Sequence, residues 1–401
     1  MDLLQNTVQP YDWGSTTLLP ELMGLSPTGA PQAELWMGAH PAAPSRVVRG
    51  EGAVPLDQVI SEAPEPELGA ATMRRFGPRL PFLVKLLAAD APLSVQVHPD
   101  LAQAQAGYAR ENALGVPADA PHRNYRDAQH KPEMIVALTP FRGLCGFRTP
   151  EDCADLLDSL KVPALRPYAE TLRVVPEAQA LAEVFRAFLR PIPGLLDAVA
   201  QALVAAAGSG GAGVDASSDV DAYAAVARAH PDDPGLLSAL MLRYVELFPG
   251  EALFLGAGVP HAYLSGLGVE IMASSDNVLR CGLTSKHVDA DELVRVVRFG
   301  ALPTRVLTPR EDGGEGVYPA PVDDFRLSRY AVRAGEPPRP LLLDAPQIVL
   351  CTEGAVAVSS DGEALSIGAG QSVYLPAGAE AALQGVGIAF RATTGTAGAV
   401  G

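Results

Sequence analysis

The chain has 401 residues, of which 48% are hydrophobic and 19% are charged, so it can build packed cores and is not globally disordered. Its formal net charge of −16 argues against nucleic acid and anionic membranes as general partners, because both carry negative charge. No apolar run is long enough to cross a bilayer, and residues 1–10 lack the basic start of a signal peptide, so we expect a soluble protein of the cytoplasm.

The cysteines agree with that expectation. They are widely spaced and form no CxxC pair, which argues against a zinc knuckle or a disulfide framework. We expect all of them to be reduced and buried as small apolar residues. They are Cys145, Cys153, Cys281 and Cys351.

In chain order, the predicted elements divide the sequence into three parts. Residues 1–148 contain short apolar runs interrupted by Gly, Pro and Asp, a pattern typical of short strands. Thr149 then offers a helix N-cap before Pro150, and in the Ala- and Leu-rich segments that follow apolar residues recur three and four apart. From Gly250 onward the strand-and-turn pattern returns. The helices predicted after the first are Pro176–Arg190, Gly194–Ala207, Asp219–His230 and Gly235–Phe248, with a flexible loop at Gly208–Ser218.

An internal repeat indicates the fold of the two outer parts. Gly250–Ala262 aligns without a gap with Gly370–Ala382, and each copy has a glycine, an apolar strand, an Ala-Gly turn and a returning strand. Regular short strands of this kind predict a mainly β protein: two cupin-type jelly-roll β-sandwich domains with an inserted α-helical domain. The predicted division is 1–148 and 250–312 for the catalytic cupin domain, 149–249 for the helical insert and 313–401 for the C-terminal jelly roll.

The repeat also provides a control for one histidine. His261 falls opposite Ala381, and no histidine follows His287, so the fold itself does not require an imidazole at this turn. We therefore expect the C-terminal jelly roll to bind no metal, to contribute no catalytic group and to act by packing against the first domain.

A metal site is one of two interpretations of four polar residues near predicted strand ends. The strict alternation of residues 93–98 puts Gln96 and His98 on the same face of a strand. Glu133 opens a second apolar strand, and His261 lies on the repeated turn. One amide oxygen, one carboxylate and two imidazoles suit Zn²⁺ with an open position for water or substrate. Composition and spacing give equal weight to the alternative, in which each side chain is an ordinary hydrogen-bonded residue.

The scarcity of lysine points to the same regions of the sequence. Only four of the 30 basic residues are lysines, and Lys85, Lys131 and Lys286 lie in the blocks around these polar residues. A compact ammonium group suits phosphate binding or proton transfer. Chance is the alternative, because four is a small number.

Glu270 is expected to be buried and paired or functional. It alternates with Val269 and Ile271 in an apolar strand, where an unpaired carboxylate would be costly. A turn at residues 275–277 follows and leads to Arg280. Two interpretations of Arg280 stay open at this point: a structural partner of Glu270 or a functional cation.

Five segments resemble the type I mannose-6-phosphate isomerase family. They are Gln9–Ser15, Ala33–His40, Leu93–Asp100, His130–Glu133 and Gly268–Lys286. The resemblance runs from Gln9 to about Val297, is weakest in the helical insert, and fits the C-terminal copy as the family's second jelly roll. It implies an active-site arginine at Arg280 and a single Zn²⁺. The implied metal ligands are Gln96, His98, Glu133 and His261.

The implied reaction is the reversible isomerisation of mannose 6-phosphate and fructose 6-phosphate, in which a proton moves between C1 and C2 through an enediol intermediate. Zn²⁺ would stabilise the developing oxyanion. The group that takes the carbon-bound proton is Lys131, His130 or Asp276. The substrate-binding residues are expected to be Lys286 for the phosphate, with Ser94, Lys85, Tyr263 and Glu270. The expected partner is a small sugar phosphate, and the expected state is a monomer.

Two other functions compete with this one. Two histidines and a carboxylate with open positions also suit an Fe(II) cupin oxygenase, but Gln96 as a fourth ligand and the Lys and Arg cluster argue against it. A non-catalytic sugar-phosphate-binding cupin would need no proton-transfer group, so Lys131 and Arg280 argue against that alternative.

Overall fold

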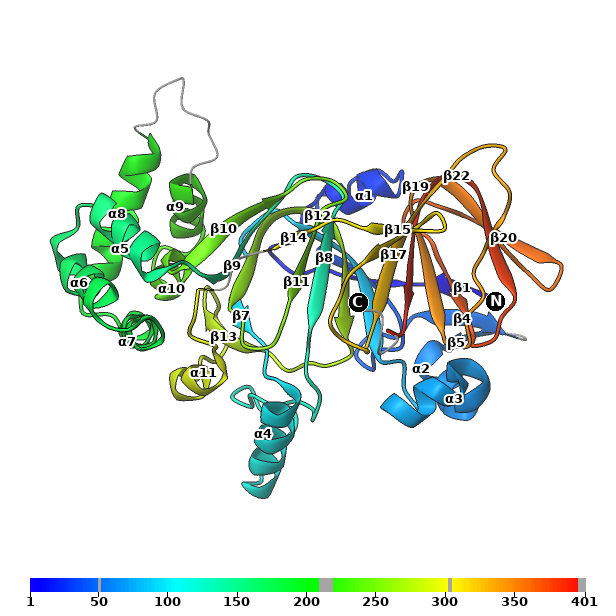
Figure 1. The fold of residues 1–401 in the computed structure, drawn as a ribbon, viewed down its shortest axis with the longest axis horizontal. Helices are drawn as coiled ribbons and strands as arrows, with labels where there is room; N and C mark the ends of the chain where they lie inside the picture. Colours follow the sequence, from blue (N-terminus) through cyan, green and yellow to red (C-terminus); the bar gives the residue numbers. More distant parts are fainter. Residues whose placement is uncertain (50–51, 209–218, 302–304, 396–401) are drawn as a thin grey trace.

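The computed structural model describes the chain except residues 50–51, 209–218, 302–304 and 396–401. Within these described parts the strands form two groups of eleven, and the strands of each group pair antiparallel. A layer of helices lies at one end of the molecule, the first group of strands in the middle and the second at the other end (Figure 1). The predicted fold class is confirmed: the protein is mainly β, with two cupin-type jelly rolls and a helical insert.

The first group of strands forms the barrel at the middle of the molecule, and its longest strand, β12, belongs to both sheets of that barrel. The N-terminal part of β12 pairs with β7 and β9, and the C-terminal part pairs with β6 and β8. The change of sheet occurs at Gly266, whose φ of 121° is a left-handed conformation that favours glycine. The strands are β2 Thr7–Gln9, β3 Glu34–Met37, β6 Phe82–Ala89, β7 Val95–Val97, β8 Glu133–Ala137, β9 Phe141–Phe147, β10 Leu242–Leu247, β11 Ala252–Leu255, β12 His261–Ala273, β13 Leu279–Gly282 and β14 Val306–Leu307.

The second group of strands contains the other copy of the repeat. Its strands β21 and β22 correspond to β11 and β12 of the first group. Each begins 120 residues after its counterpart, at the matching position of the alignment. Strand β1 pairs with β21, so the first residues of the chain complete the C-terminal sheet. The predicted domain boundaries do not include this pairing. The strands are β1 Asp2–Gln5, β4 Arg46–Arg49, β5 Gly52–Pro55, β15 Arg310–Asp312, β16 Glu315–Tyr318, β17 Arg326–Val332, β18 Arg339–Pro340, β19 Gln347–Ser360, β20 Glu363–Gly368, β21 Ser372–Leu375 and β22 Ala381–Thr393.

Apart from the short helix Arg166–Val174, which was not predicted, the helices of the insert follow the prediction up to the last one. Thr149 caps the first helix by accepting a hydrogen bond from the Asp152 amide at 3.1 Å. The predicted helix over Gly235–Phe248 is wrong in its second half: it ends at Leu240, and β10 follows because the open edge of β9 takes a partner strand there. The predicted loop lies, from residue 209, outside the described residues. The helices are α5 Pro150–Ser159, α6 Arg166–Val174, α7 Glu177–Leu189, α8 Leu195–Gly208, α9 Asp219–Ala229 and α10 Gly235–Leu240, with a 3-10 turn at Pro163–Leu165.

Five further helices, all outside the insert, were not predicted from the sequence. The clearest missed signal is at α4, where Asp100 and Gln103 form a capping box: the Asp100 carboxylate accepts from the Gln103 amide at 2.8 Å, and the Gln103 side chain accepts in return at 2.9 Å. No helix in the described ranges is long and apolar enough to cross a membrane. The five are α1 Leu18–Leu22, α2 Leu56–Glu62, α3 Pro64–Phe76, α4 Leu101–Ala113 and α11 Ala290–Val296.

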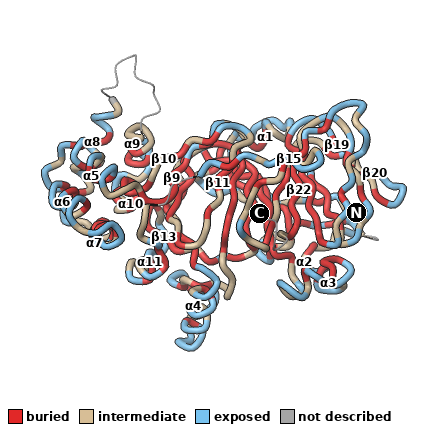
Figure 2. Tube along the Cα trace, in the orientation of Figure 1, coloured by how far each residue is buried: buried red, intermediate tan, exposed pale blue. Residues whose placement is uncertain are grey.

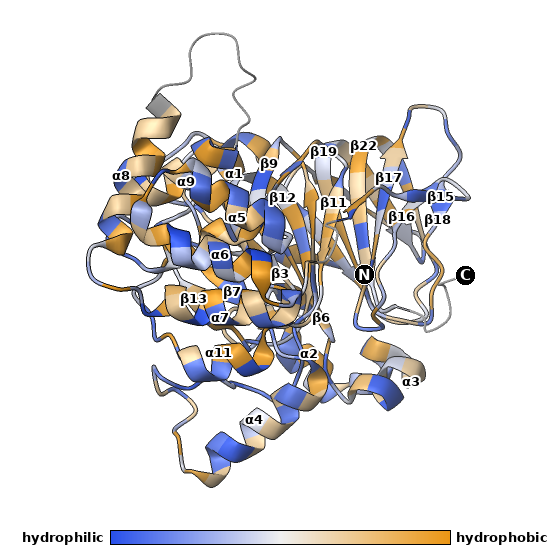
Figure 3. Ribbon diagram, turned by 60° about the vertical axis from the view of Figure 1, so that its left-hand side comes forward, coloured by the Kyte–Doolittle hydropathy of each residue, from blue (hydrophilic) through white to orange (hydrophobic). Residues whose placement is uncertain are grey.

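Continuous apolar cores join the three layers. One core contains Val84 and Ile271 of the barrel together with Leu350 and Phe390 of the C-terminal sheet, so the two jelly rolls share buried residues at their contact (Figure 2). Helices α5 to α9 carry both hydrophobic and hydrophilic residues, as expected of helices with one buried face (Figure 3). Their core also takes in residues 95 and 97 of β7. The side chain between these two, Gln96, therefore faces the other way, into the barrel.

Candidate metal centre and active site

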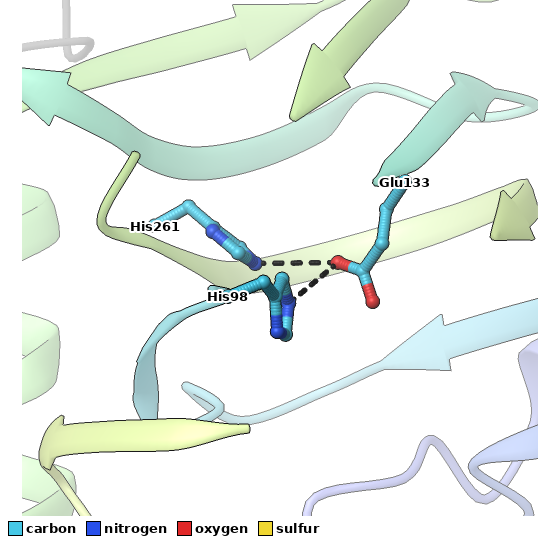
Figure 4. A group of neighbouring side chains, drawn as sticks. All are labelled: His98, Glu133 and His261. Carbon is cyan, nitrogen blue, oxygen red and sulfur yellow. Dashed lines mark ion pairs between the residues drawn. The ribbon is translucent and has the colours of Figure 1, made fainter. Parts of the chain in front are cut away.

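Three predicted metal ligands meet inside the barrel. His98 follows β7, Glu133 begins β8 and His261 begins β12 (Figure 4). The Nε2 atoms of His98 and His261 lie 3.2 and 3.3 Å from Oε2 of Glu133. All three residues are at most 4% exposed. The fold thus brings His98 and His261, which are more than 160 positions apart in the chain, to the same carboxylate.

The geometry of these donors fits a bound zinc ion. A tetrahedral ion with bonds of about 2.0–2.1 Å keeps neighbouring donor atoms roughly 3.3 Å apart. The observed separations of 3.2 and 3.3 Å match that spacing. Nε2 of His98 is also buried without a hydrogen-bond partner, which a metal ion would satisfy.

Hydrogen bonds to the backbone orient the two imidazoles for metal binding. Nδ1 of His98 donates to the carbonyl oxygen of Asn277 at 2.9 Å, and Nδ1 of His261 donates to that of Val259 at 3.0 Å. Each ring therefore presents an unprotonated Nε2 toward Glu133. Burial lowers the pKa of His98 to about 4, which keeps its ring in the neutral form that binds metal.

Gln96 lies beside this cluster on the wall of the barrel. The register of the sheet pairs it with His261 on one side and with Arg280 on the other. Its amide nitrogen donates to Oγ of Ser94 at 3.2 Å, so its amide oxygen is the atom that can coordinate a metal. These three neighbouring strands bring a fourth donor and a guanidinium to the same face.

A cleft of about 1010 Å³ opens above the cluster. Eleven of the sequence-predicted site residues line it, whereas His98 is fully buried beneath its floor. A cleft of this volume is large enough for a small sugar phosphate. The eleven are Ser94, Gln96, Lys85, Lys131, Glu133, His261, Tyr263, Glu270, Asp276, Arg280 and Lys286.

Comparisons of the sequence and of the structure relate the chain to known proteins of one family. A model of the type I phosphomannose isomerase catalytic domain matches residues 1–150. The mannose-6-phosphate isomerase of Escherichia coli (strain K12) is 41% identical over 381 residues, which is 94% of this chain and 95% of that protein. The human mannose-6-phosphate isomerase is 33% identical over 414 residues and covers 93% of this chain. The chain belongs to the type I phosphomannose isomerase family.

A solved structure of the family agrees with this assignment over the whole chain. The mannose 6-phosphate isomerase of Salmonella typhimurium, bound to its substrate fructose 6-phosphate and to zinc, superposes with a TM-score of 0.90 at 38% identity. The alignment covers 99% of this chain and 100% of that one. The phosphomannose isomerase fold therefore includes both jelly rolls and the helical insert.

Of the three predicted proton-transfer residues, two line the cleft. Nζ of Lys131 lies 3.2 Å from Oε1 of Glu133. Asp276 lies 3.3 Å from Nε2 of His40, and this contact holds the pKa of the Asp276 carboxyl below its usual value. The third, His130, is not among the residues that line the cleft; its Nε2 lies 2.9 Å from Oδ2 of Asp324 in the C-terminal domain.

The partner of Glu270 differs from the one considered in the sequence. Oε2 of Glu270 lies 2.9 Å from Nζ of Lys85, which also contacts Glu34 at 3.3 Å. Arg280 forms no ion pair among the described residues, so its charge is available to the cleft. The Lys85 ammonium is already paired with two carboxylates, so it is less available to a phosphate than the Lys286 ammonium.

Tyr263 and several residues that the sequence did not single out complete the surroundings of the site. Burial, together with nearby Glu270, raises the pKa of Tyr263 well above its usual value, so its hydroxyl stays protonated. Asp127 accepts from the backbone of Asp276 at 2.8 Å, and Asn277 accepts from the Arg126 amide at 2.7 Å. No local pattern in the sequence predicts these hydrogen bonds, because the two residues of each bond lie about 150 positions apart in the chain.

Proposed function

We propose that the chain is a zinc-dependent aldose–ketose isomerase that interconverts mannose 6-phosphate and fructose 6-phosphate. The observation that carries this function is the buried cluster of His98, Glu133 and His261, whose donor atoms have the spacing of zinc ligands. The cleft above it contains two cations, Arg280 and Lys286, that form no ion pair among the described residues. The relatives that are 41% and 33% identical over nearly the whole chain are both mannose-6-phosphate isomerases. The enzyme moves a proton between C1 and C2 of the sugar.

The residues that would hold zinc are the three of the cluster together with Gln96. When bound, zinc supplies a Lewis acid that polarises the oxygens on C1 and C2 of the sugar. Arg280 is proposed to stabilise the negative charge that develops on those oxygens; its support is its position beside Gln96 and the lack of an ion-pair partner in the described chain.

Proton transfer is proposed for Lys131 or Asp276. Both line the cleft, and Asp276 stays ionised at neutral pH because its pKa is lowered by His40. An ionised carboxylate can accept the carbon-bound proton in one direction and return it in the other. His130 is not carried into this proposal, since its imidazole contacts Asp324.

The phosphate is proposed to bind at the rim of the cleft near Lys286 and Ser94. The support is a group of cations there, formed by Lys286, Arg280 and the neighbouring Arg126, on a chain whose net charge is −16. Tyr263 and Glu270 are proposed as sugar contacts, and Lys85 as the residue that neutralises Glu270.

A coupled assay tests the function. Mannose 6-phosphate is converted to fructose 6-phosphate and then to glucose 6-phosphate, and the rate is measured before and after chelation and again after zinc is restored. We expect activity to disappear with zinc and return with it, at one zinc per chain. Iron in the purified protein together with oxygen consumption would instead favour an Fe(II) cupin oxygenase, and phosphate-sugar binding without turnover would favour a non-catalytic cupin.

Three further assignments are part of the proposal. A cytoplasmic enzyme is supported by four buried cysteine thiols, which suit a reducing compartment. A monomer is supported by the fact that one chain supplies every residue of the site. A division into a catalytic cupin of residues 1–148 and 250–312, a helical insert of 149–249 and a metal-free jelly roll of 313–401 is supported by the repeat, in which Ala381 takes the place of His261.

A further inference from the structure

The loop that carries Lys286 is held in place by the helical insert. Asp233 lies in the turn between α9 and α10, and its two carboxylate oxygens accept different backbone hydrogen bonds. Oδ2 accepts from the amide of Thr284 at 2.8 Å, and Oδ1 accepts from the amide of Gly235 at 2.7 Å. Oγ1 of Thr284 then accepts from the amide of Lys286 at 3.1 Å. One carboxylate thus links the insert to the loop at the rim of the cleft.

Backbone packing between the same two segments is unusually close. A Cβ atom added at Gly235 would collide with Leu283 and Gly282, and one added at Gly282 would collide with Gly235. Leu283 has a φ of 56°, a left-handed conformation that a non-glycine residue keeps only where its surroundings impose it. The turn of the insert therefore determines the path of residues 282–284.

The cations beside this loop lack an anion. Lys286 and Arg280 both line the cleft, and neither forms an ion pair in the part of the chain that the structure describes. Burial lowers the pKa of both, and the positive charge of Arg126 lowers each of them further. Cations that raise each other's energy in this way are stabilised when an anion binds among them.

We propose that Asp233 is a positioning residue for the phosphate of the substrate: by holding residues 282–286, it fixes Lys286 where the dianionic phosphate group of a sugar binds. The inference rests on the proposed function, which assigns Lys286 to the phosphate. It gives the helical insert, which supplies none of the proposed metal ligands, a role in substrate binding.

If Asp233 acted only through its charge, its removal would have the opposite effect on phosphate binding, so an experiment can distinguish the two roles. Asp233 carries a negative charge near an anion-binding site, so removing that charge by itself would strengthen phosphate binding. If Asp233 acts by positioning, its removal instead weakens binding. The adjacent Asp232 is a matched control, because it is exposed, lines the same wall of the cleft and has no hydrogen bond or ion pair among the described residues.

The experiment compares Asp233→Ala with Asp232→Ala. The measurements are kcat and KM for mannose 6-phosphate, the inhibition constant of inorganic phosphate, zinc content and thermal stability. For Asp233→Ala we expect KM and the phosphate inhibition constant to rise together by about tenfold, the loss typical of one charged hydrogen-bonding group, with kcat within about threefold and one zinc per chain. For Asp232→Ala we expect both constants to stay the same or to fall.

Two further variants separate the possible failures. If Asp233→Ala does not fold, Asp233→Asn, which keeps one accepting oxygen, is expected to give a smaller rise in the same two constants. Unchanged or lower constants in the folded Asp233 variant, or a loss confined to kcat or zinc content, would overturn the positioning role. Lys286→Ala tests the assignment beneath it: if that variant leaves both constants unchanged, the proposed phosphate site is wrong, whereas a rise with Lys286→Ala alone rejects only the role of Asp233.

Discussion

Lys85 illustrates, at the scale of single residues, how the cleft keeps charges buried. Its ammonium lies between Glu34 and Glu270 at 3.3 and 2.9 Å and over the ring of Trp36 at 5.3 Å. Burial alone would lower the pKa of Lys85, but the two carboxylates hold it above its usual value. The cation is therefore retained at neutral pH, and its removal leaves two carboxylates without a partner.

We predict that Lys85→Met lowers the free energy of unfolding by about 3–5 kcal/mol, the cost of leaving a buried charge uncompensated. Urea denaturation at pH 7 measures the change. Lys161→Met is the control, because Lys161 is exposed, and its substitution is expected to have little effect. A loss below about 1 kcal/mol at Lys85 would mean that water reaches the two carboxylates.

Arg280 carries the clearest prediction for catalysis. Arg280→Ala is expected to fold and to keep its zinc, since the arginine forms no ion pair among the described residues, but to lose about 10²–10³ in kcat, the usual cost of removing one group that stabilises an oxyanion. Steady-state kinetics and metal analysis measure the two effects separately. Near-normal kcat in a zinc-loaded variant would assign Arg280 a structural role.

At the scale of elements, helix α11 is linked to α4 and to the segment that follows α4 by the buried carboxylate of Glu292. Glu292 accepts from the hydroxyl of Tyr125 at 2.6 Å and from Arg110 at 2.8 Å. Burial alone would raise the pKa of Glu292, but these hydrogen bonds lower it below its usual 4.5. A carboxyl group with a lowered pKa in the folded state stabilises the fold above the pKa of the unfolded chain, and this contribution is lost as the pH falls through the lowered value.

We predict that Glu292→Gln lowers stability by about 1–2 kcal/mol at pH 7, because it replaces hydrogen bonds to a charged group by neutral ones. The difference from the unchanged protein should become smaller as the pH falls below 4.5, where the unfolded chain takes up the proton, and should vanish once the pH passes the lowered pKa of the native carboxyl. Thermal denaturation at a series of pH values measures this. Asp291→Asn, at a carboxylate of the same helix that is 84% exposed, is the control and should show neither effect.

At the scale of the whole molecule, the two jelly rolls form one structural unit. They share a core that includes Ile271 and Phe390, and β1 pairs with β21. Asp324 also reaches from the C-terminal domain to His130, the residue before Lys131. The C-terminal jelly roll therefore covers apolar surface of the barrel and supports the segment that leads to the proposed metal ligand Glu133.

A chain that ends near Asp312 tests this interpretation. It exposes the shared apolar core and leaves β1 without its partner, so we expect loss of solubility or of thermal stability rather than a change in substrate preference. Size-exclusion chromatography, metal analysis and the coupled assay are the measurements. A soluble fragment with full zinc content and no activity would show instead that the C-terminal domain takes part in catalysis.

Features that depend on neighbouring residues could be predicted from the sequence. The alternation around Gln96, the N-cap at Thr149 and the repeat that contrasts His261 with Ala381 are local patterns, and the structure has the strand, the helix and the matching pairs of strands they predict. Such patterns are reliable because strand faces and helix ends are decided within a few residues. The fold class followed from such patterns, and the family followed from the resemblance of five longer segments.

Which distant groups become partners could not be predicted from the sequence and depends on how the chain packs. It pairs Glu270 with Lys85 rather than with Arg280, turns His130 toward Asp324, and ends the predicted helix at Leu240 because β9 offers an open edge. These outcomes depend on which of several cations or strands the packed chain brings within hydrogen-bond distance. Charge pairing and strand pairing act through space over a few ångströms, and no local pattern in the sequence records which segments will lie that close.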